Sequence, residues 1–234
     1  MTSIANGFDE YISQPDQQTK IWHYMDFTKY LALLQTRSLF LCQVTRLDDK
    51  YEGSQSYLAP EIPVLNEVYK ALIPIGSFLL RKNAAVSCWH INDDESAALW
   101  KIYVTNNEGV AIQTTVERLI DSLAQKPTYR GQIIYGSIDW KEGNTSAKIA
   151  VSFFNKRPSF KHEQEYRIVI QSNDSMDELG GVNVSVTLDR LIENVYIAPS
   201  AAKWFAKLVE EITVEKYGLK FPVIQSDLDK SPLY

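Results

Sequence analysis

The fold class is indicated most clearly by Glu165-Tyr166-Arg167-Ile168-Val169-Ile170-Gln171, which is followed by Gly180-Gly181 and then by Val182-Asn183-Val184-Ser185-Val186-Thr187. In residues 165–171 and 182–187, apolar and polar side chains alternate with a period of two, as they do in strands that bury one face. Acidic residues and the two glycines separate these runs, and this is the composition of a turn. We therefore expect two antiparallel neighbouring strands in a hairpin-like unit.

Further apolar runs predict strands along the rest of the chain. These runs are Ile21–Tyr24, Ser38–Val44, Ala84–His90, Val110–Thr114, Gln132–Ile138, Val195–Ala198 and Phe221–Gln225. Segments with helical spacing lie between several of them, but strands and helices do not alternate regularly. The sequence therefore predicts an α+β fold with a mixed, mostly antiparallel sheet flanked by helices, and not a doubly wound fold.

Polar caps, proline and glycine indicate where the helices begin and end. The residues expected to cap helices at their N-termini are Asp26, Asn92, Thr115 and Ser200. Pro74 is expected to break the apolar segment 57–82 into two helical pieces, because proline removes a backbone donor and clashes with the preceding turn. Gly218 is expected to end the last helix.

The length of 234 residues is that of one large domain. Residues 1–19 are polar and lack periodicity, so they are predicted to form a mobile or loosely docked N-terminal arm, and residues 20–234 a single domain. Cys42 and Cys88 lie in apolar runs, where a reduced cysteine behaves as a small hydrophobe. Without a signal-like segment or a run of roughly 18 apolar residues, we expect a cytoplasmic protein that does not enter a membrane.

The charge balance bears on the class of partner. A formal net charge of -5 and a pI near 5.3 argue against a broad nucleic-acid-binding surface, which needs clustered Lys and Arg. Lys156, Arg157 and Lys161 form a small basic cluster, which we interpret as a solvated loop. The sequence contains no Gly-rich dinucleotide fingerprint, phosphate loop or Gly-x-Ser-x-Gly elbow, so three large enzyme classes are excluded.

Polar chemistry is concentrated in His162-Glu163-Gln164-Glu165-Tyr166-Arg167. Because residues two apart on a strand point the same way, Glu163, Glu165 and Arg167 are expected to share one face. Burial or carboxylate repulsion would raise the pKa of one acid, while the guanidinium would keep the other ionised. This pattern suits catalysis, and an in-line salt bridge on an exposed strand is the alternative.

A second candidate is the acidic loop Leu47-Asp48-Asp49-Lys50-Tyr51-Glu52-Gly53. Asp49 and Glu52 could position a ligand hydroxyl or a basic side chain, since loops that follow strands often carry function. The alternative is a turn that begins with Asp and ends at Gly53.

The three histidines, His23, His90 and His162, are each expected at a strand edge. If the sheet brings them together with a carboxylate, they could bind a transition metal in a hydrolase or nuclease. Their spacing matches no metal signature, so separate structural histidines are favoured and no metal is expected.

A family resemblance is carried by several motifs in order along residues 21–199. They are Trp22-His23-Tyr24, Leu47-Asp48-Asp49-x-Tyr51-Glu52-Gly53, Val86-Ser87-Cys88-Trp89-His90, Glu95 to Tyr103, Gly109-Val110-Ala111-Ile112, and Lys156-Arg157-x-x-Phe160-x-x-Glu163-x-Glu165-Tyr166-Arg167. Together they resemble a bacterial domain-of-unknown-function family, DUF family 2971. The resemblance does not imply a particular activity.

The chain also has a more distant likeness to ADP-ribosyltransferases. That likeness places His23 on the early strand, Ser87 on the middle strand, and Glu163 with Glu165 on the late strand. It implies that His23 holds the adenosine ribose of NAD, Ser87 supports the glutamate strand, and Glu165 binds the nicotinamide ribose and stabilises positive charge as nicotinamide leaves. Glu163 would orient the acceptor, and the rings expected to stack on nicotinamide are those of Tyr24, Trp89 and Tyr103.

The likeness leads to the hypothesis of an NAD-using, ADP-ribosyltransferase-like enzyme in toxin or phage-defence biology. Its partners would be a nucleotide and an acceptor that the sequence does not identify. Two alternatives stay open: a metal-dependent hydrolase or nuclease, and a noncatalytic ligand-sensing domain.

Overall fold

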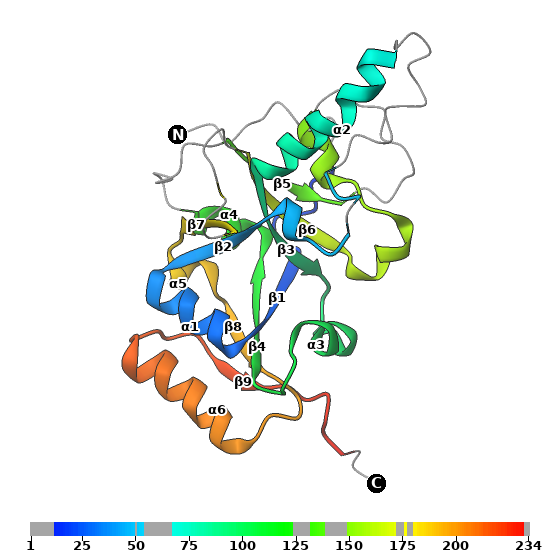
Figure 1. The fold of residues 1–234 in the computed structure, drawn as a ribbon. Coiled ribbons are helices and arrows are strands. Elements are labelled where there is room, and N and C mark those ends of the chain that lie inside the picture. Colours follow the sequence, from blue (N-terminus) through cyan, green and yellow to red (C-terminus); the bar gives the residue numbers. More distant parts are fainter. Residues whose placement is uncertain are drawn as a thin grey trace. The chain divides into compact units, whose positions relative to one another are not determined.

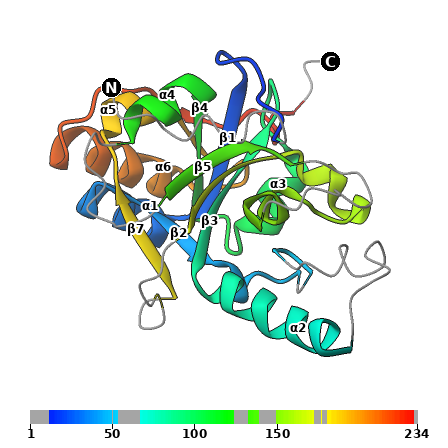
Figure 2. The same cartoon turned by 90° about the horizontal axis from the view of Figure 1, so that it is seen from above.

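The computed structural model describes residues 12–49, 51–53, 67–123, 132–138, 149–171, 176 and 180–231. These residues form an α+β fold whose nine strands belong to a mixed, mostly antiparallel sheet, and several helices pack on the strands (Figures 1 and 2). The predicted fold class is confirmed. No helix in the described ranges is long and apolar enough to span a bilayer.

The chain divides into two compact units, each assembled from three segments. The first unit contains residues 1–15, 40–88 and 128–184, and the second contains residues 16–39, 89–127 and 185–234. The prediction of a single domain for residues 20–234 stays a prediction.

The first unit carries the Glu-x-Glu segment. Its elements are β2 (Ser38–Gln43), η1 (Val44–Arg46), α2 (Glu67–Lys82), β3 (Ala84–Ile91), β5 (Gln132–Ser137), η3 (Ile149–Phe154), η4 (Pro158–Glu163), β6 (Glu165–Gln171) and β7 (Gly181–Ser185), of which β2, β3 and β7 each continue into the second unit. Strand β6 pairs antiparallel with β5, with Tyr135 opposite Ile168, and has β3 as its other neighbour. This position makes β6 an interior strand, and Glu165 to Ile170 are all buried.

An apolar core supports this part of the sheet. It includes Val86, Ile134, Phe153, Phe154 and Val169, all almost fully buried. Burying side chains of this size contributes about 1.5–3 kcal/mol each. The core therefore fixes the strand that carries Glu165 and Arg167.

The second unit contains the earlier histidines. Its elements are β1 (Lys20–Asp26), α1 (Phe27–Thr36), α3 (Ala97–Tyr103), β4 (Gly109–Thr115), α4 (Val116–Ser122), α5 (Leu188–Leu191), β8 (Asn194–Ile197), α6 (Lys203–Glu210), the π-helical turn η5 (Glu211–Lys216) and β9 (Val223–Gln225). Strand β4 lies between β1 and β8 with antiparallel pairing on both sides, whereas β8 and β9 are parallel. An aromatic core of Trp22, Tyr24 and Trp100 packs between β1 and α3.

The expected hairpin of β6 and β7 is wrong. Strand β7 pairs with β2, and the backbone N–H of Gln43 donates to the carbonyl of Gly180 at 2.9 Å. A Cβ at Gly181 would lie 2.1 Å from the carbonyl oxygen of Leu41, so glycine is needed for this close approach. Gly180-Gly181 therefore marks contact with an earlier strand, and not a turn between neighbours.

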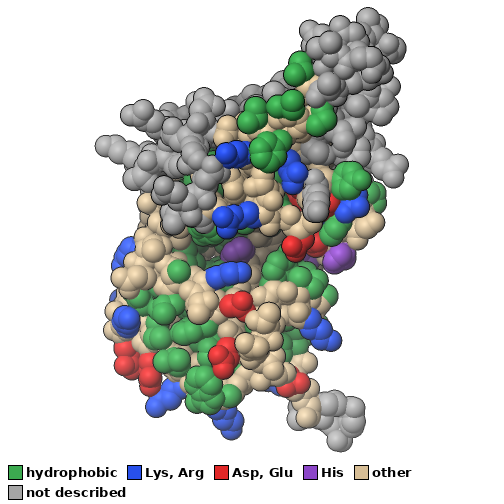
Figure 3. Space-filling view, viewed as in Figure 1, with side chains coloured by type: hydrophobic (Ala, Val, Ile, Leu, Met, Phe, Trp, Pro, Cys, Tyr) green, Lys and Arg blue, Asp and Glu red, His purple; other side chains and the backbone are tan. Residues whose placement is uncertain are grey.

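The expected break at Pro74 is also wrong, because α2 continues through it from Glu67 to Lys82. Pro74 lies on an exposed side of the helix, where water can satisfy the carbonyl that loses its donor. The same helix exposes Leu72, Ile75 and Phe78, and hydrophobic side chains gather over α2 in Figure 3.

Two of the four predicted caps lie at helix starts. Thr115 caps α4 by accepting from the N–H of Arg118 at 3.3 Å. Asp26 occupies the cap position of α1, but its carboxylate accepts from Thr105 instead.

The other two predicted caps are wrong. Ser96, and not Asn92, caps α3, and α6 begins after Ala202, while Ser200 contacts Asp229. In both cases a later residue with extended backbone precedes the first helical turn. The predicted end of the last helix at Gly218 is confirmed by its positive φ of 67° and its N–H bond to Val214.

The described part of the predicted N-terminal arm, residues 12–19, is attached to its units. Ile12 is buried in the first core, and the Ser13 carbonyl accepts from the N–H of Ser137 at 2.9 Å. In the second unit, Gln17 accepts from the N–H of Glu117 at 2.9 Å. The remainder of the arm, residues 1–11, lies outside the described residues.

Candidate functional site

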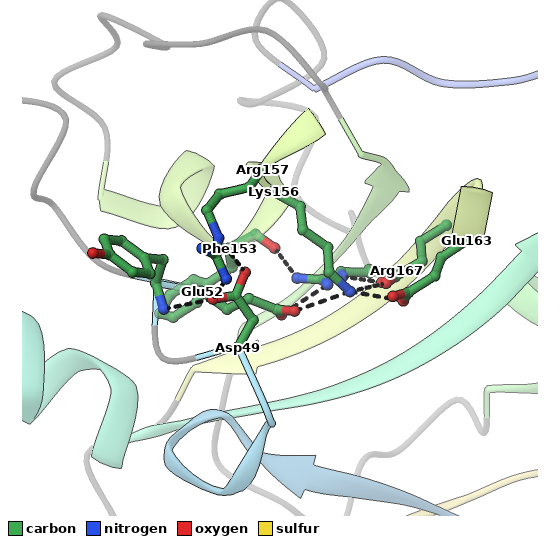
Figure 4. A network of polar contacts seen from close by, with 9 residues as sticks. Asp49, Glu52, Phe153, Lys156, Arg157, Glu163 and Arg167 are labelled. Atoms are coloured by element: carbon green, nitrogen blue, oxygen red, sulfur yellow. Dashed lines mark hydrogen bonds and ion pairs between the residues drawn. The ribbon is translucent and has the colours of Figure 1, made fainter. Parts of the chain in front are cut away.

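Lys156 is the centre of a buried charge network in the first unit (Figure 4). Its Nζ lies 2.6 Å from Glu165 Oε1, 2.7 Å from Glu163 Oε2 and 3.1 Å from Glu52 Oε1. A lysine is rarely buried unless carboxylates surround it. Burial alone would lower the pKa of Lys156, but Glu165 and Glu52 raise it above its ordinary value, so the ammonium group is charged.

Arg167 supplies the second buried cation. Its Nε donates to Glu165 Oε2 at 2.5 Å, and its Nη1 donates to the Phe153 carbonyl at 2.9 Å. Its Nη2 lies 2.8 Å from Glu52 Oε2, an ion pair without the alignment of a hydrogen bond. Both carboxylate oxygens of Glu165 are therefore engaged by cations, and Glu165 is 4% exposed.

Counting charges singles out Glu163. Lys156 and Arg167 balance Glu52 and Glu165, which leaves Glu163 as a third carboxyl that shares Lys156 with the other two. Burial, followed by the hydrogen bond to Glu165, raises the pKa of Glu163 to about 7, although Lys156 opposes the shift. The pKa of Glu165 is held well below its ordinary value, because Arg167, hydrogen bonds and Lys156 outweigh the effect of burial. The two neighbouring acids therefore differ in pKa, and Glu163 is the one that titrates near neutral pH.

The sequence predicted that Glu163 and Glu165 share one face of a regular strand, and this prediction is wrong. Glu163 ends η4, and β6 begins at Glu165. Between them, Gln164 has a positive φ of 38°, a conformation that non-glycine residues rarely adopt. This kink places both carboxylates on Lys156.

The acidic loop is tied to this network at two points. Asp49 accepts from Arg157 Nη2 at 2.9 Å and from Arg157 Nε at 3.2 Å, while Glu52 contacts Lys156 and Arg167. Gly53 ends the loop at φ 67°, where a Cβ would lie 2.8 Å from the ring of Phe153. Both readings of the loop are therefore realised: it is a turn ended by glycine, and its acids position basic side chains.

The interpretation of Lys156, Arg157 and Lys161 as a solvated loop holds for Lys161 alone, which is exposed. Lys156 is 8% exposed and Arg157 is only partly exposed. Sequence reasoning therefore missed Lys156 as the link between the acids. The available signal was its place seven residues before Glu163, in a segment already noted for its acids.

In the second unit, the structure brings together His23 and Trp89, whose rings stack with centroids 4.8 Å apart. His90 is buried near Tyr24, with ring centroids 6.5 Å apart. The hydroxyl of Tyr24 accepts from the N–H of Ser96 at 2.7 Å, and burial raises its pKa above the ordinary value. Tyr24 and Trp89 are therefore core rings.

The remaining candidates lie in different environments. Ser87 is 3% exposed on β3, whereas His162 on η4 is exposed. Tyr103 is 41% exposed at the end of α3, so it is the most exposed of the three rings expected to stack on nicotinamide. Within the described ranges, no three His, Cys, Asp or Glu side chains are arranged to hold a metal ion.

A cavity of about 380 Å³ lies in the second unit, beside α6, β8 and β9. Its lining includes Ile197, Lys203, Lys207 and Gln225. None of the residues predicted to form the site lines this cavity. We therefore place the candidate chemistry in the charge network of the first unit.

Residues 99–168 match the model of a family described as proteins of unknown function, DUF2971. The resemblance expected from the motifs is confirmed over this segment, which is less than half of the chain and includes Lys156, Glu163 and Glu165. No curated protein matches the chain.

Among solved structures, the chain is similar to Thermus sp. 2.9 DarT in three complexes. The complex with carba-NAD+ gives a TM-score of 0.45 at 11% identity, covering 92% of this chain and 98% of that chain. The complex with NAD+ gives 0.44 at 11% identity with the same coverage, and the complex with ADP-ribosylated single-stranded DNA gives 0.44 at 10% identity, covering 93% and 98%. TM-scores below 0.5 establish no shared activity, so no functional conclusion follows from them.

Proposed function

We propose that the chain is an enzyme that transfers ADP-ribose from NAD to an acceptor, with Glu163 as its acid–base residue. The observation that carries the proposal is the pair Glu163 and Glu165, whose carboxyl groups have pKa values driven in opposite directions. Neighbouring carboxyls with such divergent environments are the usual basis for assigning acid and base roles. We infer NAD as the substrate from the order of His23, Ser87 and the Glu-x-Glu segment along the sequence, which resembles that of ADP-ribosyltransferases.

The contacts of Glu163 and Glu165 indicate different roles for the two acids. Both oxygens of Glu165 are bound to cations, so in place of the predicted contact with the nicotinamide ribose we assign this residue to positioning Lys156 and Arg167. Glu163 is the more exposed of the two, with 13% of its side chain accessible. A carboxyl whose pKa is about 7 suits a general base near neutral pH.

The charge balance fits a substrate that brings positive charge. Asp49, Glu52, Glu163 and Glu165 face three cations, Lys156, Arg157 and Arg167, so one carboxylate has no cation of its own. In NAD, the bond between the ribose carbon and the cationic nicotinamide would break, and nicotinamide would leave with the bonding pair. The same ribose carbon would form a bond to the acceptor atom. Ionised Glu163 would stabilise positive charge at that carbon and take the proton of the acceptor.

The other predicted contacts remain part of this proposal. His23 would hold the adenosine ribose, Ser87 would support β6 from the neighbouring strand β3, and Tyr103 would stack on nicotinamide, as the sequence predicts. Toxin or phage-defence biology is the setting in which we expect such an activity.

A second candidate is a noncatalytic ligand-sensing domain. It is favoured by the saturation of the network, since Lys156 contacts three carboxylates and Arg167 is 2% exposed. Structural ion pairs also produce strongly shifted pKa values. In this case the cluster would hold β6, η4 and the acidic loop together, and Glu163 would bind a cationic ligand without turnover.

The test is incubation of the purified chain with NAD labelled in its ADP-ribose part, together with cell lysate, while nicotinamide release and label transfer are measured. We expect Glu163→Gln to reduce both by 10²- to 10⁴-fold, the usual contribution of a general base, while NAD binding is retained. Glu211→Gln is the matched control, because Glu211 is an acid whose side chain is 46% exposed and pairs with Lys207. Release that is unaffected by Glu163→Gln would exclude the proposed role, and NAD binding without release in the wild type would favour the second candidate.

A further inference from the structure

Arg157 lies close to two aromatic rings in the first unit. Its guanidinium carbon is 4.7 Å from the ring centroid of Tyr51 and 5.3 Å from that of Phe160. These distances are within the range of cation–π contacts, and guanidinium groups commonly stack on aromatic faces. The three side chains make a stack that the acid–base chemistry of Glu163 does not use.

Asp49 fixes this stack in place. Its carboxylate, 2% exposed, accepts two hydrogen bonds from Arg157 and one from the backbone N–H of Tyr51 at 3.0 Å. A bidentate contact of this kind sets the plane of the guanidinium as well as its position. The stack is therefore preorganised, although 42% of the Arg157 side chain and 53% of Tyr51 are exposed.

We propose that Tyr51, Arg157 and Phe160 form a stacking platform that binds the base of a nucleotide. Tyr51 has a cation near its ring and remains more than half open to solvent, so a planar base can lie against it. The two Arg157 nitrogens bound to Asp49 are Nε and Nη2, so Nη1 is the guanidinium nitrogen that would donate to a phosphate oxygen. This site goes beyond the proposed function, because it requires neither NAD nor turnover.

The surrounding charges limit how many phosphates the platform contacts. Lys156, the neighbour of Arg157, is neutralised by three carboxylates, and the chain carries a net charge of -5. Lys161 on η4 is an exposed cation near Phe160 in the sequence. Because affinity for polynucleotides depends on the number of neutralised phosphates, we expect one or two phosphate contacts and stacking as the main attraction.

The platform adjoins the acid pair. The ring of Phe160 contacts both Arg157 and the Nζ of Lys156, at 4.8 Å, and the same Nζ binds Glu163. A nucleotide on Tyr51 would therefore lie on the same part of the first unit as Glu163. A base in a duplex is already stacked on its neighbours, so free nucleotides and unpaired bases are the two sources of this ligand.

Equilibrium binding to the full chain tests the platform, with AMP and a fluorescein-labelled ten-nucleotide single-stranded DNA as probes. We expect Tyr51→Ala to weaken binding of the bound probe by roughly 10- to 100-fold, and Tyr51→Phe to retain it, because stacking needs the ring and not the hydroxyl. Phe78→Ala is the matched control, since Phe78 is an equally exposed ring at 56% on α2. Circular dichroism of each variant verifies folding.

The two probes distinguish the source of the base. Tighter binding of the oligonucleotide, with a logarithmic salt slope of about -0.7 for each phosphate contacted, indicates single-stranded nucleic acid, and equal or tighter binding of AMP indicates a free nucleotide. The platform is excluded if neither probe binds, or if Tyr51→Ala binds both as the wild type does. Because no NAD turnover is measured, this outcome is independent of the catalytic role of Glu163.

Discussion

The ammonium group of Lys156 lies 2.7 Å from the carboxyl group of Glu163, yet it is shared with Glu52 and Glu165. Lys156 and Arg167 supply two positive charges and cannot fully compensate three acids at this largely buried site. The acid with the most exposure and without a guanidinium contact, Glu163, therefore has the raised pKa. A carboxyl group that can gain and lose its proton near neutral pH is the basis of the proposed chemistry.

The pH dependence of stability should change in Glu163→Gln. The folded-state pKa of about 7 lies above the ordinary value of 4.5, so between these pH values the unfolded chain loses a proton that the folded chain keeps. As pH rises from 4.5 to 7, Glu163 therefore lowers the free energy of unfolding by up to about 3 kcal/mol. Above pH 7 this loss of stability stays constant. Urea denaturation at pH 4.5 and 7.5 should show the variant gaining relative to the wild type at the higher pH; parallel curves would contradict this.

Lys156→Met should destabilise the fold more at pH 8 than at pH 5. Removing the cation leaves buried carboxylates uncompensated, which typically costs about 3–5 kcal/mol, and protonation at lower pH relieves part of this cost. Lys207→Met is the control, because Lys207 is 77% exposed in a 3.4 Å pair and should change stability by less than about 1 kcal/mol. Equal losses for the two variants would show that Lys156 is not the centre of the network.

Glu165 and Arg167 should be strongly coupled. Glu165→Gln and Arg167→Met each break a buried ion pair and are expected to cost about 3–5 kcal/mol, whereas the double variant should cost clearly less than their sum. A double-mutant cycle by guanidinium denaturation measures this coupling. Additive effects would mean that their 2.5 Å contact contributes little.

Gly53→Ala should destabilise the acidic loop. An added Cβ would lie 2.8 Å from the Phe153 ring, at a φ of 67° that disfavours a side chain. We expect a loss of about 1–3 kcal/mol. Gly76→Ala on α2 is the control, since no atom lies within 4 Å of its added Cβ and alanine favours helices. A Gly53→Ala protein as stable as wild type in thermal denaturation would rule out this strain.

Local patterns predicted the strands well because each is an apolar run with clear ends. Ser38–Val44 and Gln132–Ile138 match β2 and β5 to within one residue. The pairing of the strands was harder to predict from the sequence. Strand β7 pairs with β2 because Gly181 fits against Leu41, and such a close contact produces no periodic pattern of residues. Pro74 continues a helix because its exposed side tolerates the lost hydrogen bond.

The candidate site was predicted in part. Glu163, Glu165 and Arg167 were identified from their spacing, and Asp49 and Glu52 from their loop. Lys156 was misjudged, because the burial of a lysine depends on carboxylates contributed by Glu52, more than a hundred residues earlier, as well as by nearby acids. The roles of His23, Ser87 and Tyr103 in binding NAD, and the cytoplasmic location, stay predictions.

The pKa of Glu163 itself is the most direct test of the account. Side-chain carboxyl ¹³C shifts followed by NMR from pH 4 to pH 9, with the Glu163 signal assigned by its loss in Glu163→Gln, give this value. The account predicts a midpoint near 7 for Glu163, and for Glu165 a pKa well below its ordinary value, because Arg167 and Lys156 outweigh the effect of burial. A Glu163 midpoint near 4.5 would contradict it.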